Sequence, residues 1–405
     1  MLALPLPQRE FYAKQRDRKH MFFSLNKQTK TMKLFDVYPL YNVTPVSAKG
    51  SVVIDDKGQK YWDFYGGHAV ISIGHSHPHY VRRIKEQLDN IGFYSNAVQN
   101  PLQLELAEKI GELSGCEDYN LFMCNSGAEA NENALKLASF HNGKTRIIAF
   151  NNGFHGRTSA AVAVTDNEKI NAPLNKQQKA TILPLNDLDA FKAEIVKEDV
   201  CGVIIESIQG VGGLDEPTTA FLKNVAALCK ENNVVLIADE VQSGYGRSGK
   251  FFAFQHHDIQ PDVITIAKGM GNGFPVGGVL IHESIKASYG LLGTTFGGNH
   301  LACAASLAVL EVIHDEHLIK NADNLYLYFV EKAAEIPQVK KVKGRGLMLG
   351  LEFDFEVAEL RKKLIHNQFM FTGGAKDKHV LRVLPALNIT KENLDTFFTA
   401  LKAEL

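Results

Sequence analysis

The sequence predicts an α/β fold built on a mostly parallel sheet. Between residues 120 and 267, short apolar runs alternate with amphipathic segments, at the spacing that is typical of strands joined by helices. Two of these runs, Val234–Ala238 and Val263–Ala267, are followed directly by Asp239 and Lys268. Because the carboxyl ends of parallel strands meet at one edge of a sheet, we expect this acid and this amine to lie in one ligand site.

The composition is that of a protein with a large core. The chain has 405 residues, of which 45% are hydrophobic and 22% charged, enough for more than one domain. Its net charge of −1 gives no electrostatic reason to expect nucleic acid or an anionic membrane as a partner. No apolar run approaches the length of a membrane span. The five cysteines contain no CxxC pair and indicate reduced thiols, so we expect a soluble, cytoplasmic enzyme.

The first 31 residues differ from the rest of the chain. They are basic and irregular, and they lack the continuous apolar core of a secretory signal. Glu10 and Asp17 also argue against a transit peptide. We expect residues 1–31 to form a flexible extension, unless translation begins at Met32.

The next segment predicts a hairpin and a helix. Ser51–Asp55 and Lys60–Phe64 flank a Gly-containing turn, which is typical of two antiparallel strands. Pro78 suits the first turn of a helix whose apolar stripe is Val81, Ile84 and Leu88.

Three histidines alternate just before and within this predicted helix, at positions His75, His77 and His79. Their spacing raises the question of a metal site. The flanks are turn-like and offer no neighbouring carboxylate or cysteine ligand, so we predict no metal here.

The remaining elements follow the same alternation. An amphipathic helix is marked by Leu102, Leu106, Ile110 and Leu113. We then expect strands at Asn120–Cys124, Arg146–Phe150, Val203–Ile205, Val234–Ala238 and Val263–Ala267, and helices at Ala128–Ala138, after His155 and at Phe221–Cys229. A long helical region, Leu301–Ala334, leads to a smaller α+β segment that ends in a capped helix from Thr390 to Leu405.

The pairing of Lys268 with Asp239 fits a particular chemistry. A lysine in an apolar pocket loses proton affinity and can attack an aldehyde. A carboxylate that faces a pyridine nitrogen keeps that nitrogen protonated, as an electron sink requires. The pair therefore indicates pyridoxal 5′-phosphate (PLP), although a turn-capping aspartate and a solvated lysine are the alternative for these two residues alone.

Further residues supply what such a cofactor needs. Asn125–Asn131 opens a predicted helix with small residues, and a helix N-terminus attracts a phosphate, although an ordinary capped helix has the same signature. The turn Thr294–Asn299 adds hydroxyls. Phe154 could stack on a flat ring, and Arg157 could hold a carboxylate unless it lies at the surface. Arg382, in an apolar strand, would be costly to bury without an anion.

From Phe35 to its C-terminus the chain resembles class III PLP-dependent aminotransferases of the acetylornithine, succinylornithine and ornithine type. The resemblance rests on NSGAEANENALKLA, FHGR, ESIQG, ADEVQSGYGRSG, the strand to Lys268, TTFGGN and RVLP. It implies the fold type I of PLP-dependent transferases, with a mixed, mostly parallel seven-stranded sheet in a large domain and a smaller α+β domain. It also implies a homodimer with active sites at the interface. We expect the segment 32–75 to join the small domain, 76–300 to form the large domain and 301–405 the C-terminal small domain.

The resemblance also implies residue roles in holding the cofactor. Lys268 would link it covalently and later move the proton, and Asp239 would pair with the pyridine nitrogen. Gln242 would contact the ring hydroxyl, and Phe154 would stack on the ring. The phosphate would be bound by Ser126, Gly127 and Ala128, and by Thr295 of the neighbouring subunit.

Substrate contacts follow from the same resemblance. Arg157 and Thr294 match positions that touch an acylated ornithine, and Arg382 matches a carboxylate-binding arginine. Glu206 ends its strand near the ring without an assigned role.

Two departures from the family pattern concern the substrate. Val211 stands where related enzymes have the glutamate that pairs with the arginine matching Arg382. His68 stands where ornithine-specific members have tyrosine and acetylornithine members an aliphatic residue. Both changes make the pocket more receptive to negative charge, which suggests an N-succinylornithine substrate. Sequence drift, with N-acetylornithine still preferred, is the alternative, and both stay open.

The expected reaction passes the terminal amine of an acylated ornithine to 2-oxoglutarate, in arginine biosynthesis. An ornithine δ-aminotransferase of catabolism is the alternative within the class. A nicotinamide dehydrogenase is disfavoured, because Phe274 stands where the third glycine of GxGxxG would fall after Gly269 and Gly271. A binding protein without catalysis is disfavoured by the presence of Lys268 and Asp239.

Overall fold

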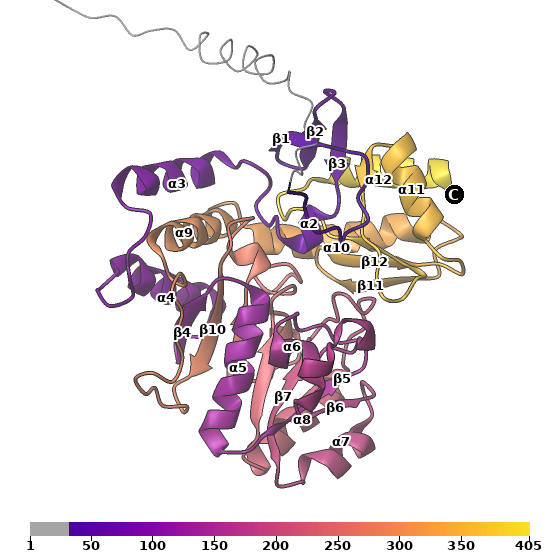
Figure 1. The fold of residues 1–405 in the computed structure, drawn as a ribbon. Helices are drawn as coiled ribbons and strands as arrows, with labels where there is room; N and C mark the ends of the chain where they lie inside the picture. Colours follow the sequence, from indigo (N-terminus) through magenta and orange to yellow (C-terminus); the bar gives the residue numbers. More distant parts are fainter. Residues whose placement is uncertain (1–31) are drawn as a thin grey trace, which may run out of the picture. The chain divides into compact units, whose positions relative to one another are not determined.

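The computed structural model describes residues 32–405 (Figure 1). The extension expected over residues 1–31 lies outside the described residues. The chain divides into two units, Met1–Val43 and Thr44–Leu405. Residues 32–43 of the first unit contain no helix or strand, and the elements below belong to the second unit.

A seven-stranded sheet forms the centre of this second unit. Its order is β4 (Tyr119–Cys124), β10 (Gly277–His282), β9 (Val263–Ile266), β8 (Val235–Asp239), β7 (Val200–Ile205), β5 (Arg146–Phe150) and β6 (Ala180–Leu183). All strands run in one direction except β10, which is antiparallel to both of its neighbours. The prediction of a mixed, mostly parallel sheet is therefore confirmed.

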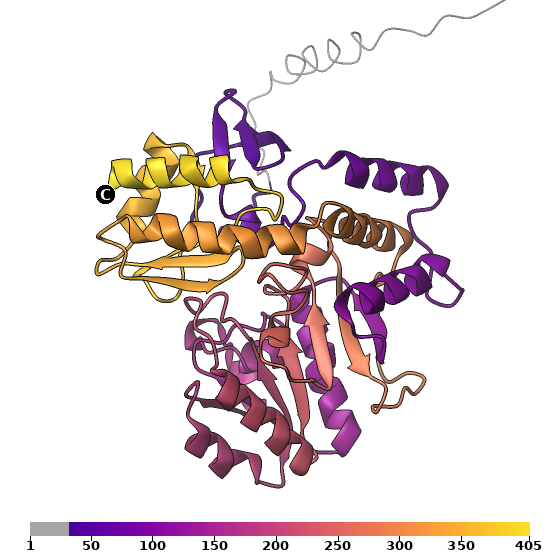
Figure 2. The ribbon, with the colours of Figure 1, turned by 180° about the vertical axis from the view of Figure 1, so that it is seen from behind.

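Helices cover both faces of this sheet. In β5, Ile147 and Ala149 pack in one core with residues of α5 (Gly127–Asn142), whereas Ile148 and Phe150 pack in another with α7 (Leu188–Ile195) and α8 (Thr219–Glu231). Helix α5 crosses the near face in Figure 1, and α7 and α8 lie on the near side in Figure 2. Burial on both faces explains why these strands are continuous apolar runs.

Two small sheets combine early and late parts of the chain. The first contains β1 (Pro45–Lys49), β2 (Val52–Asp55), β3 (Lys60–Asp63) and β13 (Met370–Phe371), and the second contains β11 (Lys341–Arg345), β12 (Met348–Glu352) and β14 (Val380–Val383). Strand β13 pairs in parallel with β3, and Phe64 contacts Phe397 with ring centroids 5.2 Å apart. Contacts of this kind connect part of the segment 32–75 with the C-terminal part of the chain. The domain boundaries stay a prediction.

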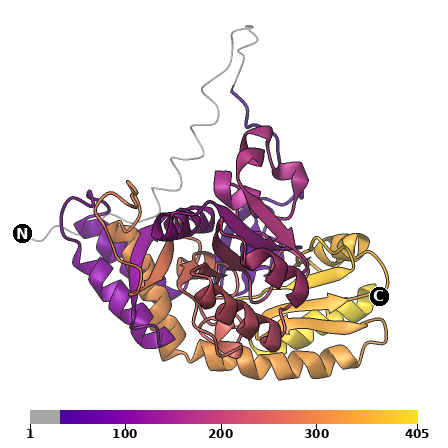
Figure 3. The ribbon, with the colours of Figure 1, turned by 90° about the horizontal axis from the view of Figure 1, so that it is seen from below.

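The other helices surround these sheets. They are α2 (Gly66–Ala69), α3 (Pro78–Asn90), α4 (Pro101–Ser114), α6 (Ser159–Ala163), α9 (His300–Asp315), α10 (Leu318–Ala334), α11 (Ala358–Asn367) and α12 (Lys391–Glu404). Short 3-10 turns lie at η2 (Glu168–Ile170), η3 (Pro173–Gln177), η4 (Ala253–His256) and η5 (Lys268–Met270). Figures 1 and 3 agree in placing α3 and α4 at one end of the large sheet and the C-terminal helices at the other.

Several predicted elements have different bounds or were missed. The helical region predicted at Leu301–Ala334 is two helices, because His317 takes a left-handed conformation (φ 52°) between them. Strands β6 and β10 and helix α7 were not predicted, and β10 begins with two glycines that look like a turn in sequence. The hairpin of β2 and β3 and the N-cap of α12 are confirmed: the Thr390 hydroxyl accepts from the amide of Asn393.

The topology brings five chain segments to one edge of the large sheet. Because β4 is antiparallel to β10, it runs in the same direction as β9 and ends at the same edge. The segments that follow β4, β5, β7, β8 and β9 therefore meet there. Within residues 32–405, no helix is both long enough and apolar enough to cross a membrane.

Candidate functional site

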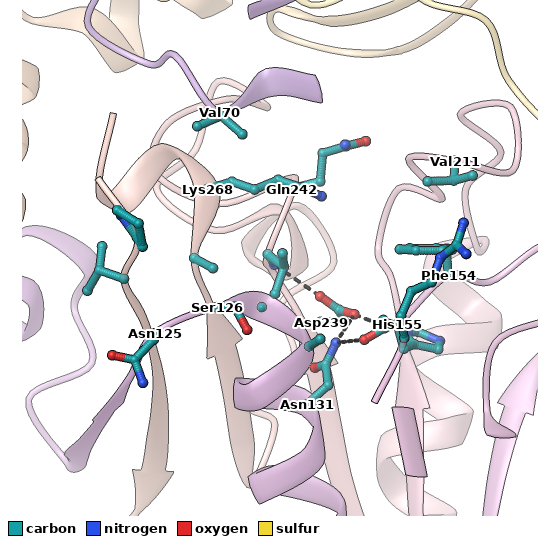
Figure 4. A pocket seen from close by; sticks show the side chains of 18 of the residues that line it. Val70, Asn125, Ser126, Asn131, Phe154, His155, Val211, Asp239, Gln242 and Lys268 are labelled. Atoms are coloured by element: carbon teal, nitrogen blue, oxygen red, sulfur yellow. Dashed lines mark hydrogen bonds and ion pairs between the residues drawn. The ribbon is translucent and has the colours of Figure 1, made fainter. Parts of the chain in front are cut away.

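A cavity of about 360 Å³ lies at this edge of the sheet (Figure 4). Of the site residues predicted from the sequence, it brings together Ser126, Gly127, Ala128, Phe154, Arg157, Asp239, Gln242 and Lys268. His68, Thr294, Thr295 and Arg382 are not part of its lining. The hydroxyl of Thr294 accepts from Nδ2 of the Asn125 side chain at 3.3 Å, and Asn125 does line the cavity. Thr295 is exposed.

The buried carboxylate of Asp239 is held by three donors. Its Oδ1 accepts from the backbone amide of Val241 at 3.0 Å. Its Oδ2 contacts Nδ1 of His155 at 2.7 Å and accepts from Nδ2 of Asn131 at 2.8 Å. The orientation of the carboxylate is thus fixed by contacts from helix α5, from the loop after β5 and from the residues that follow its own strand. The dashed lines in Figure 4 show these contacts.

His155 places a second charge beside Asp239. Burial by itself would lower the pKa of His155, but the hydrogen bond and the negative charge of Asp239 raise that pKa above its usual value. The fold therefore favours an imidazolium next to this carboxylate. Neither His155 nor Asn131 was predicted as a site residue, although both lie inside the motifs that carry the family resemblance.

Lys268 follows β9 in a strained conformation. Its φ is +45°, in the left-handed region that side chains other than glycine rarely adopt. Removal from water lowers the pKa of Lys268, the carboxylates of Asp239 and Glu206 oppose that shift, and the cation of Arg382 adds to it. A depressed pKa leaves more of the amine unprotonated and nucleophilic.

The N-terminus of α5 forms a close-fitting cradle. Ser126 caps the helix by accepting from the amide of Glu129 at 3.2 Å. A Cβ at Gly127 would lie 2.5 Å from Cγ1 of Val241, and a Cβ at Gly156 would lie 2.7 Å from Cβ of Ala128. Gly127 and Ala128 line the cavity, so the start of α5, where backbone N–H groups attract an anion, lies at the cavity wall.

Glu206 ties two loops of the cavity together. Its carboxylate accepts from the backbone amide of Phe154 through Oε1 and from that of Gly210 through Oε2, both at 2.9 Å. Burial raises the pKa of Glu206 to about 7. Because one carboxyl group anchors the segments after β5 and β7, Phe154 is held at the side of the cavity.

Arg382 is buried just outside the cavity. Its Nε donates to the carbonyl of Gly374 at 2.6 Å and its Nη1 to that of Gly210 at 2.7 Å, and its guanidinium lies 5.9 Å from the ring centroid of Tyr65. Within residues 32–405, no carboxylate lies within ion-pair distance of Arg382. Burial lowers the pKa of Arg382.

His68 lies in a turn with a left-handed backbone conformation. Four successive residues, Gly66 to Ala69, have positive φ angles, which costs energy at His68 and Ala69. The backbone carbonyl of His68 accepts from Nε2 of Gln242 at 3.1 Å, and the imidazole ring of His68 contacts the hydroxyl of Tyr65. Burial and then the cations of Arg382, Lys268 and Arg361 lower the pKa of His68. These groups make this side of the site electropositive.

Two buried polar atoms in the site await a partner. Among the described residues, none hydrogen-bonds to Oε1 of Gln242 or to Oδ1 of Asn131. A buried polar atom of this kind is costly unless a ligand satisfies it. With the Asp239 carboxylate, the Phe154 ring, the helix end at Gly127 and the amine of Lys268, this donor and acceptor set fits a flat, phosphorylated pyridine aldehyde.

The three alternating histidines have separate carboxylate partners. His75 contacts Asp63 at 2.8 Å and His77 contacts Glu316 at 2.9 Å, while His79 contacts Glu311. The part of the chain that the structure describes contains no group of three side chains arranged to hold a metal ion.

Comparisons with known proteins agree with this geometry. The family model for aminotransferase class-III matches residues 37–405. Acetylornithine aminotransferase of Bacillus subtilis is 40% identical over 375 residues, covering 91% of this chain and 96% of that protein. The enzyme of the same name from Methanocaldococcus jannaschii is 41% identical over 382 residues, with 90% and 94% covered.

Solved structures show the same fold. The ornithine aminotransferase of Toxoplasma gondii superposes with a TM-score of 0.83 at 27% identity, over 99% of this chain and 95% of that one. A second structure of that enzyme, described as having partial occupancy of PLP at the active site, has a TM-score of 0.82. The family match, the curated relatives and the PLP-shaped site lead to one conclusion: the chain belongs to the class-III aminotransferases and is a PLP-dependent enzyme.

Proposed function

We propose that this enzyme transfers the terminal amino group of an N-acylated ornithine to 2-oxoglutarate, as a step in arginine biosynthesis. The observation that carries the proposal is the identity of about 40% to acetylornithine aminotransferases over nine-tenths of the chain. The ornithine aminotransferases among the solved structures are only 27% to 28% identical, so the catabolic alternative has weaker support.

When bound, PLP supplies an aldehyde and an electron-accepting ring for amino-group transfer. Lys268 would bond to the aldehyde carbon and, once free, carry a proton to and from the substrate carbon through Nζ. Asp239 would hold the proton on the ring nitrogen, with its negative charge supported by His155, Asn131 and the Val241 amide. The fixed carboxylate needs no reorganisation during the reaction.

The other cofactor contacts follow from the cavity. Ser126, Gly127 and Ala128 would bind the phosphate at the start of α5, with Thr295 reaching it from the neighbouring subunit. Gln242 would contact the ring hydroxyl, and its unpaired Oε1 supports that role. Phe154 would stack on the ring.

The substrate contacts are the cationic groups at the mouth of the site. Arg157 and Thr294 would contact the acylated ornithine, and Arg382 would bind a carboxylate. The curated relatives are named for acetylornithine, whereas the cations around His68 favour an acyl group that ends in a carboxylate, such as succinyl. Both acyl groups are compatible with the proposed reaction.

A homodimer with the active site at its interface completes the proposal. None of the 13 residues of α3 is buried, although the helix has an apolar stripe. Large apolar side chains are exposed at the end of α3, in the segment that follows it, in α4 and in the turn before α9: Leu88, Ile91, Phe93, Tyr94, Val98, Leu104 and Phe296. Phe93 and Phe296 contact each other with ring centroids 5.5 Å apart. Exposed apolar side chains in this number support an interface on this part of the chain, and they include Phe296, the neighbour of Thr295.

The five buried free thiols support a cytoplasmic location.

We expect kcat/KM, with 2-oxoglutarate as acceptor, to be at least tenfold higher for an acylated ornithine than for ornithine, because removing an acyl group that the site contacts costs binding energy in the transition state. Steady-state assays with N-acetylornithine, N-succinylornithine and ornithine measure this. A preference for free ornithine would contradict the proposal.

If the succinyl compound is preferred, His68→Val should lower the ratio of kcat/KM for N-succinylornithine to that for N-acetylornithine by about tenfold.

Replacing Asp239 by asparagine should lower kcat on the order of 10²-fold or more, because the amide keeps the shape but loses the charge that retains the ring proton. The matched control is Asp258→Asn, whose carboxylate is 94% exposed and pairs with Lys223. Equal kcat values for the two variants would show that Asp239 has no electrostatic role.

A methyl group at Gly127 should obstruct the phosphate cradle. We expect Gly127→Ala to raise the Kd for PLP by about tenfold, because its Cβ would lie 2.5 Å from Val241 Cγ1 and overpacking displaces the helix start. Titration of the apoenzyme with PLP, followed by absorbance, measures this. Gly143→Ala, at the other end of α5, has open space around it but is strained by its φ of +72°, so it controls for loss of stability without a steric clash. An equal rise in Kd in both variants would argue against the cradle.

The apolar patch should hold the dimer together. Phe296→Asp should convert the protein to monomers in sedimentation velocity, because an aspartate would be buried without a partner in the interface. Leu174→Asp, at a side chain that is 79% exposed on η3, should remain dimeric. A Phe296→Asp protein that sediments like the wild type would place the interface elsewhere.

A further inference from the structure

A loop of the C-terminal part reaches the wall of the cofactor cavity. This loop, residues 373–378, connects β13 with β14. The backbone amide of Lys376 donates to the carbonyl of Val211 at 2.8 Å, and that of Asp377 donates to the carbonyl of Gly212 at 3.2 Å. Val211 lines the cavity, so the loop is bonded to one of its walls.

The side chain of Lys376 continues the contact. Its Nζ lies 2.7 Å from Oδ2 and 2.9 Å from the backbone oxygen of Asp166. The same Oδ2 of Asp166 accepts from the backbone amide of Asn152 at 2.8 Å, and the amide of Asp166 donates to the carbonyl of Gly153 at 3.0 Å. Lys376 is thereby joined through Asp166 to the segment that precedes Phe154.

That segment is held by contacts from outside it. Asn152 has a φ of +64°, in the left-handed region that asparagine enters more readily than most residues with a side chain, and its backbone amide is fixed by the Asp166 carboxylate. The turn at Gly212 packs directly against it, since a Cβ at Gly212 would lie 2.7 Å from the Asn152 carbonyl oxygen. Three loops therefore support one another: 151–154, 209–213 and 373–378.

The supported residues form one side of the cavity. Figure 4 shows Phe154 and Val211 together on the side away from Asn125 and Ser126. A shift of either backbone segment would change the width of the space that the cofactor ring is to occupy.

We propose that Lys376 and Asp166 are positioning residues that hold the Phe154–Val211 wall of the cofactor cavity and so couple the C-terminal loop to cofactor binding. This inference rests on the PLP dependence of the enzyme, and it is independent of which amino donor is used. The ion pair bridges two backbone segments through one carboxylate, unlike a pair between two free surface chains.

The competing explanation is that Lys376 and Asp166 form an ordinary surface ion pair with no effect on the cavity. Many exposed ion pairs make no measurable contribution to stability. Lys376 and Asp166 are 44% and 33% exposed. Burial would raise the pKa of Asp166, but the hydrogen bond from the Asn152 amide and the contact with Lys376 lower the pKa below its usual value. These two partners therefore stabilise the ionised carboxylate.

The chain offers a matched control two residues away. Lys378 pairs with Glu356 at 3.1 Å, with exposures of 70% and 56%, and the side chain of Lys378 makes no hydrogen bond to the loops 151–154 and 209–213. The variants are Lys376→Met, Asp166→Asn, the double variant, Lys376→Arg and Lys378→Met. Asp166→Asn removes the charge and keeps an oxygen for the Asn152 amide.

The first readout is the Kd for PLP, measured by titration of each apoenzyme. Lys376→Met and Asp166→Asn should each raise the Kd about fivefold. The double variant should be no weaker than the singles, Lys376→Arg should retain tight binding, and Lys378→Met should match the wild type.

The second readout is hydrogen–deuterium exchange of the apoenzymes, which does not depend on the cofactor or on turnover. Peptides that cover residues 151–154 and 210–213 should exchange faster in Lys376→Met but not in Lys378→Met. Identical Kd values and identical exchange for these two variants would overturn the proposal. So would additive effects of Lys376→Met and Asp166→Asn, which would mean that the residues act separately.

Discussion

The candidate site is arranged around one buried carboxylate at the end of one strand. Asp239 ends β8 and is held from Val241, Asn131 and His155. Burial of a charge is tolerated only when it is paired and hydrogen-bonded. The parallel sheet provides the position, and α5 and the loop after β5 provide the partners. Each of these elements therefore contributes to the placing of a single negative charge in the wall of the cavity.

Left-handed backbone also occurs at and beside the same site. Lys268, Asn152, His68 and Ala69 are four of the thirteen described non-glycine residues with positive φ angles. Such conformations persist where surrounding contacts over-determine them, and they are common where function needs an exact orientation. Here the contacts are identifiable: Gln242 holds the carbonyl of His68, and Asp166 holds the amide of Asn152. The rigid sheet and its cores bear the cost of these local distortions.

The substrate side of the site is built from cations. Arg382 is anchored by the carbonyls of Gly210 and Gly374, with Val211 in place of an acidic residue beside it. Because backbone carbonyls bring no full negative charge, these contacts leave the positive charge of Arg382 without an opposite charge beside it, as the proposed carboxylate-binding role requires. The contacts that orient this arginine come from Gly210 in the loop 209–213 and Gly374 in the loop 373–378, two of the three loops that support one another.

The sequence by itself determined five of the seven strands of the large sheet, the edge at which the cavity lies and most of the predicted residues that line it. Those features are local: apolar runs encode strands, and the residues directly after them, such as Asp239 and Lys268, must lie at the carboxyl edge. Only the tertiary structure decided which side chains support them. Asn131 and Asp239 are 108 residues apart, and Lys376 and Asp166 are 210 apart. Strand β10 escaped prediction for a similar reason, because its glycines become a strand only through pairing with β4 and β9. Contacts between distant segments leave no periodic signal in the sequence, so packing alone brings them together.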